Sequence, residues 1–80
     1  MEIHAIEQLI QAGMPGSQVK VTGDGSHFEA VVISQDFAGK SLIQKQRLVM
    51  ATVREQIDSG ELHALSIKTY TPDEWAAQSG

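Results

Sequence analysis

The sequence predicts a small α+β domain in which helices pack on one face of a three-stranded mixed sheet. Apolar residues recur at helical spacing in two stretches, and three short segments alternate apolar and polar residues as strands do. Turn residues separate these segments in the order helix, strand, strand, connector, helix, strand, helix. The length of 80 residues indicates a single domain spanning residues 1–80.

The first half is predicted to contain a helix and a β-hairpin. An amphipathic helix is expected over residues 2–12, where the apolar residues at helical spacing are Ile3, Ile6, Leu9 and Ile10. "GMPG" (13–16) ends it with glycine and proline. "QVKVT" (18–22) and "HFEAVVIS" (27–34) are predicted strands, and the turn residues "GDGS" between them predict a hairpin.

The second half begins with the connector "QDFAG" (35–39), which has some helical character. A long helix is predicted from Ser41, a good N-cap, to Ser59, with Gly60 as its stop. Its apolar stripe is expected to be buried and consists of Leu42, Val49, Val53 and Ile57, widened by Ile43, Leu48 and Met50.

A third strand is predicted over residues 63–70, with Leu65 and Ile67 on one face. Because it follows a long helix, a right-handed crossover onto the same sheet is expected. Thr71 at the N-cap and Glu74 three residues later form a capping box, which opens a last helix carrying Trp75.

Composition excludes several classes of function. There is no cysteine, so neither disulfides nor an all-thiolate metal site can form. No apolar run approaches the roughly 20 residues that span a bilayer, and the N-terminus carries acids where a signal peptide carries bases. We therefore expect a cytoplasmic protein with no membrane partner. The net charge of -4 argues against broad attraction to nucleic acid.

Motifs for catalysis and phosphate binding are incomplete. "AGKS" (38–41) has Ser34 where a P-loop needs glycine, and "GMPG" lies between a helix and a strand rather than in the helix–helix loop of a KH domain. Neither a catalytic triad nor a paired carboxylate is evident. We expect neither an enzyme nor a small-molecule substrate.

Four of the six cations cluster in one stretch, namely Lys40, Lys45, Arg47 and Arg54. They could contact the phosphates of a nucleic acid. No aromatic residues interleave with them, so a solvated helix face or a protein-docking surface is favoured.

Two histidines precede or begin predicted strands. His27 starts the second strand and His63 the third, so both imidazoles could approach one end of the sheet and bind a metal. Spacing alone favours a structural role, because two ligands make a weak site. His4 is expected to be an ordinary helix-surface residue.

Three ordered motifs, "DGSHFEAVVIS", "FAGKSLIQKQRLV" and "LHALSIKTYTPDEW", resemble the BolA family, and within it the bacterial IbaG-like branch. The resemblance runs from about Val19 to Trp75. It implies an α-β-β-α-α-β-α order related to the class II KH fold, in which the 35–39 connector is a short helix or turn.

The resemblance also implies a partner and a cofactor. Members of the family pair with monothiol glutaredoxins and share a 2Fe–2S cluster with the glutaredoxin and glutathione, so no cluster is expected on the isolated chain. The family's general cluster ligand matches His63. The second ligand comes from the loop between the first two strands, where His27 is a candidate and Asp24 a weaker one.

The resemblance implies an alternative function as well. BolA-type proteins have also been regarded as transcriptional regulators that bind DNA, and in this chain a KH-like nucleic-acid-binding regulator would use the face from Lys40 to Arg54.

The sequence departs from the family pattern at two places. The long helix has Lys45-Gln46 where many members have Arg-His, so no role of that histidine is carried over. In the hairpin loop, the position that often holds the second ligand falls near Asp24 or Gly25.

Overall fold

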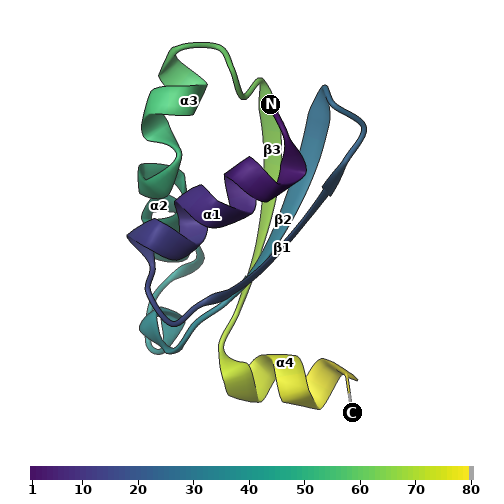
Figure 1. The fold of residues 1–80 in the computed structure, drawn as a ribbon. Helices are drawn as coiled ribbons and strands as arrows, with labels where there is room; N and C mark the ends of the chain where they lie inside the picture. The colour runs from purple at the N-terminus through teal and green to yellow at the C-terminus, as the bar shows by residue number, and fades with distance from the viewer. Residues whose placement is uncertain (80) are drawn as a thin grey trace.

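A computed structural model describes residues 1–79, in which α1, α2 and α3 lie on one face of a three-stranded sheet (Figure 1). The elements in chain order are α1 (Ile3–Gly13), β1 (Gln18–Gly23), β2 (His27–Ile33), the 3₁₀ turn η1 (Gln35–Phe37), α2 (Leu42–Thr52), α3 (Arg54–Asp58), β3 (Ala64–Tyr70) and α4 (Pro72–Ser79). The predicted class and element order are confirmed. The 35–39 connector contains the short helical turn that the family resemblance implied.

The sheet has the order β1-β2-β3, with β2 antiparallel to β1 and parallel to β3. The face of β2 that carries Phe28, Ala30 and Val32 is buried beneath the helices. Ile6 and Ile10 of α1 and Val49 of α2 are fully buried in the same core. The other face of β2 carries His27, Glu29 and Val31, which remain exposed or half-buried.

The long helix predicted over residues 41–59 is wrong in one respect, because it is broken at Val53, where φ is -121° and ψ is 17°. The hydroxyl of Thr52 donates to the carbonyl oxygen of Val49 at 2.6 Å, a local bond of the kind that competes with helix continuation. Gly13 lies against the same turn, since a Cβ there would sit 2.5 Å from Thr52 Cγ2. Glycine is therefore required where α1 approaches α2.

The prediction that the apolar residues of this helix are all buried is also wrong. Val49 and Val53 are fully buried, but Leu42, Ile43 and Met50 are 68%, 62% and 37% exposed. Ile43 and Met50 are seven residues apart, which places them on one side of α2, away from the side that carries Val49 and Val53. A single helix presents only one face to the sheet, so α2 keeps an outer apolar surface.

The predicted capping box at the start of α4 is confirmed. The backbone N–H of Thr71 donates to the Glu74 carboxylate at 2.7 Å, and the backbone N–H of Glu74 donates to the Thr71 hydroxyl at 3.2 Å. This helix extends from the end of β3 and away from the other helices (Figure 1). Trp75 packs edge-to-face on Tyr70, with ring centroids 5.2 Å apart. No helix in residues 1–79 is long and apolar enough to cross a bilayer.

Candidate functional site

His63 is held at the surface by the residue before it. Leu62 is 1% exposed, and its backbone N–H donates to the carbonyl oxygen of Gln56 in α3 at 3.0 Å. The chain then enters β3 at Ala64, and His63 between them is exposed. A buried leucine directly before the strand therefore places an imidazole at the sheet edge.

His27 begins β2 beside the hairpin turn. Its backbone N–H donates to Oδ1 of Asp24 at 2.9 Å, and its ring Nε2 lies 3.4 Å from the Ser66 hydroxyl of β3. The ring therefore lies on the face of the sheet that α1 and α2 do not cover.

Asp24 is committed to the hairpin turn. Its Oδ1 accepts hydrogen bonds from the backbone N–H groups of His27 and Ser26 and from the Ser26 hydroxyl. These donors, led by the His27 N–H, lower the pKa of Asp24 to about 2. Gly25 completes the turn at φ 99°, a backbone conformation that favours glycine. Asp24 thus has a structural role that explains it without a metal.

The two histidines lie at the same end of the sheet. His27 is paired with Ala64 in the parallel register of β2 and β3, so His63 stands one residue beyond that pair. Strand alternation continued back to residue 63 would direct the two rings to opposite faces. His63 lies outside β3, which begins at Ala64. A ligand shared by the two rings therefore requires the His63 side chain to turn toward His27.

The donor set at this end is incomplete. Within residues 1–79, no group of three or more histidine, cysteine, aspartate or glutamate side chains is arranged to hold a metal ion. Two imidazoles without thiolates fit a centre whose remaining ligands come from another molecule. They do not fit a metal site that this chain completes alone.

The predicted cationic cluster is only partly assembled. Lys40 and Arg47 line one surface pocket, and Arg47 and Arg54 line a second on the outer side of α2 and α3. Lys45 is half-buried and belongs to neither pocket. The pKa of the Glu74 carboxyl at the start of α4 is lowered chiefly by hydrogen bonds with Thr71, and the Lys45 charge adds to that lowering.

Gln46 has a contact that sequence patterns did not indicate. Its Nε2 donates to the carbonyl oxygen of Ile67 in β3 at 3.0 Å, so it ties α2 to the strand that follows His63. Leu62 was also missed, although an isolated leucine in the polar connector "SGELH" was a usable signal for an anchor.

Comparison with known proteins shows the family to which the chain belongs. The family model described as "BolA-like protein" matches residues 10–74. The chain is 40% identical over 76 residues to the acid stress protein IbaG of Escherichia coli K12, covering 95% of this chain and 90% of that protein.

Solved structures give the same result. A BolA protein homologue from Coxiella burnetii superimposes with a TM-score of 0.86 at 43% identity, covering 95% of this chain and 97% of that one. BolA1 from Arabidopsis thaliana superimposes with a TM-score of 0.76 at 30% identity, covering 92% of this chain and 98% of that one.

Proposed function

The chain belongs to the BolA family, and from that premise we propose that it is a cytoplasmic, non-enzymatic adaptor for a monothiol glutaredoxin. In this proposal it shares a 2Fe–2S cluster with the glutaredoxin and glutathione through His63, for iron sensing or cluster trafficking. The observation that carries the proposal is the exposed imidazole of His63 in a chain without cysteine. The buried Leu62 holds this residue at the start of β3.

The side chains present fit a shared cluster. His63 offers a ring nitrogen at the surface, and His27 is the candidate for a second one at the same end of the sheet. Sulfur ligands must come from the glutaredoxin cysteine and glutathione, because this chain has none. When bound, the cluster supplies one-electron redox chemistry.

Ligation by imidazole has two physical consequences. Replacing thiolate by imidazole on one iron raises the reduction potential, as in Rieske-type centres. A histidine ligand must also be unprotonated, so acid competes with iron for its nitrogen. The E. coli relative is named as an acid stress protein. In the proposed adaptor, acid would act by protonating the His63 nitrogen and so weakening its bond to the iron.

The test is to mix the protein with cluster-loaded monothiol glutaredoxin and record the visible absorption and circular dichroism spectra. We expect wild type to change the spectra and His63→Ala to abolish the change. His4→Ala is the matched control, since His4 is an exposed histidine at the helix surface. A full spectral response from His63→Ala would remove this residue from the mechanism.

A second variant assigns the other ligand. If His27 contributes, His27→Ala weakens the spectral change and leaves the docking of glutaredoxin intact. If a group of the partner occupies that position instead, His27→Ala responds as wild type does. Docking without any spectral change in wild type would show a binding module without metal and would refute the shared cluster.

A further inference from the structure

The outer side of α2 carries an exposed apolar row. Leu42, Ile43 and Met50 are the exposed large hydrophobic residues in residues 1–79, and all three belong to α2. Ile43 and Met50 are separated by seven residues, and a further seven leads to Ile57 in α3, which is half-buried. We call Ile43, Met50 and Ile57 the apolar row.

A row of cations runs beside it with the same spacing. Lys40, Arg47 and Arg54 are each separated by seven residues, and each precedes a member of the apolar row by three. All three are exposed. The ion pairs within residues 1–79 join His4 to Glu7 and Lys68 to Glu29, so this cationic row lacks a salt-bridge partner in the described chain.

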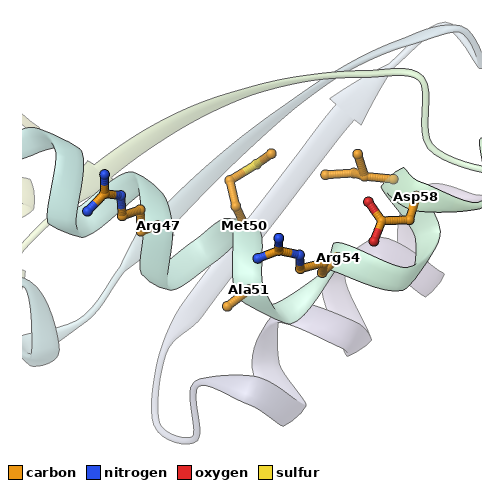
Figure 2. A pocket seen from close by; sticks show the side chains of 6 residues that line it. Arg47, Met50, Ala51, Arg54 and Asp58 are labelled. Atoms are coloured by element: carbon orange, nitrogen blue, oxygen red, sulfur yellow. The ribbon is translucent and has the colours of Figure 1, made fainter.

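Two adjoining pockets connect the cationic row with Met50 and Ile57 across the break at Val53, while Ile43 lines neither pocket. A pocket of about 410 Å³ is lined by Arg47, Met50, Ala51, Arg54, Ile57 and Asp58 (Figure 2). A second of about 310 Å³ is lined by Lys40, Gln44, Arg47, Leu48 and Ala51. They share Arg47 and Ala51, and the small side chain of Ala51 leaves space between the larger ones.

We propose that this surface binds an acidic amphipathic α-helix of a partner protein. Within α2, the seven residues from Ile43 to Met50 are two helical turns, about 10 Å, which is the spacing at which one helix presents side chains to another. Across the break at Val53, the shared pocket keeps Arg47 and Arg54 on one surface. Apolar side chains of the partner would enter the two pockets, and carboxylates seven residues apart would face Arg47 and Arg54. The partner helix would thus be recognised by apolar side chains that recur at regular spacing along one of its faces.

The observations favour a protein helix over nucleic acid. Met50 lines the same pocket as Arg47 and Arg54, where a phosphate backbone would cover its side chain without burying it in apolar surroundings. None of the residues lining either pocket is aromatic, so bases have no stacking surface.

The helix-binding surface shares no lining residue with the histidine end of the sheet. Neither pocket is lined by His27, His63 or any residue of the three strands. This inference stands on the two rows and does not require the shared cluster.

The test uses ¹⁵N-labelled protein and a synthetic helix of about four turns, with leucines seven residues apart flanked by glutamates at the same spacing. We expect amide shift changes concentrated at Ile43, Met50 and Ala51. The double variant Arg47→Glu/Arg54→Glu should bind about tenfold more weakly. A peptide with lysines in place of the glutamates should restore the affinity of that variant.

Lys20→Glu is the matched control, because Lys20 is an exposed cation on β1 and lines neither pocket. Its affinity for the peptide should equal that of wild type. All exchanged side chains are exposed, and circular dichroism checks that each variant is folded.

Three results would overturn the proposal. The first is equal binding of the acidic peptide by wild type and the Arg47→Glu/Arg54→Glu variant. The second is self-association of the free protein through Met50, seen as dimers in sedimentation that Met50→Ser abolishes. The third is displacement of the peptide by duplex DNA whose own binding falls steeply with salt, which would make this a phosphate-binding face.

Discussion

Each edge strand of the sheet makes one hydrogen bond with a side chain of a helix, and the two side chains differ in chemistry. At β1, Oε2 of Glu7 in α1 accepts a hydrogen bond of 2.9 Å from the backbone N–H of Val21. At β3, the amide of Gln46 in α2 donates to the Ile67 carbonyl oxygen. Each contact occupies a backbone group that an uncovered edge strand would offer to another chain.

The Glu7 carboxylate can be protonated, whereas the Gln46 amide cannot change its charge in this pH range. The Val21 N–H, followed by the hydrogen bond from His4, holds the pKa of Glu7 below its ordinary value of 4.5. The stabilisation from Glu7 is therefore complete above pH 4.5 and is lost as the pH falls through the lower pKa of the folded state. The Gln46 amide is unaffected by pH. Acid therefore weakens the contact of Glu7 with β1 and leaves the contact of Gln46 with β3 intact.

The largest expected effect comes from Glu7→Ala. Removing an ionised acceptor from a half-buried N–H should lower the free energy of unfolding by about 1–2 kcal/mol near neutral pH. Urea denaturation measures this, with Gln8→Ala on the exposed side of α1 as the control. The difference in the free energy of unfolding between wild type and Glu7→Ala should become smaller as the pH falls below 4.5. A difference that stays constant with pH would contradict the role of the ionised Glu7 carboxylate at β1.

Gln46→Ala should have a smaller effect. The lost bond joins neutral groups, so we expect a decrease of about 1 kcal/mol in the free energy of unfolding. The decrease should be the same near neutral pH and in acid. Hydrogen exchange should show faster opening of β3 than of β1 in this variant, and the reverse pattern would refute the assignment of the two contacts.

The smallest effect concerns His4, which is exposed and 3.0 Å from the Glu7 carboxylate. This hydrogen bond raises the pKa of His4 above 6.5, so its contribution is complete below pH 6.5 and disappears as the pH rises through the raised value. An NMR titration of the imidazole should show the raised midpoint in wild type. In Glu7→Gln the midpoint should return toward 6.5.

Much of the fold was predictable because its signals are local. Thr71 and Glu74 cap α4 through contacts three residues apart, and the "GDGS" turn specifies the hairpin through the Asp24 carboxylate and Gly25. The position of His27 and His63 at one end of the sheet also followed from strand order. Each inference needed only neighbouring residues or a topological rule.

The contacts that close the sheet edges were not predictable in the same way. Glu7 meets Val21 across 14 residues and Gln46 meets Ile67 across 21, and a single polar contact at such a separation leaves no periodic trace. Ile43 and Met50 were predicted to be buried because they are apolar. Their exposure depends on which side of α2 the core occupies, which the long apolar stripe did not distinguish.

The anchoring of Leu62 makes the spacing of the connector after α3 more important than its composition. Ser59 and Glu61 are exposed and can be exchanged, whereas Gly60 has φ 84°, a backbone conformation that favours glycine. Deleting or inserting one residue there would bring the wrong side chain to the buried position of Leu62. A one-residue shift would bury the imidazole of His63 or leave leucine in the solvent. Natural variants should therefore differ at residues 59 and 61 while keeping Gly60 and a constant number of residues between α3 and β3.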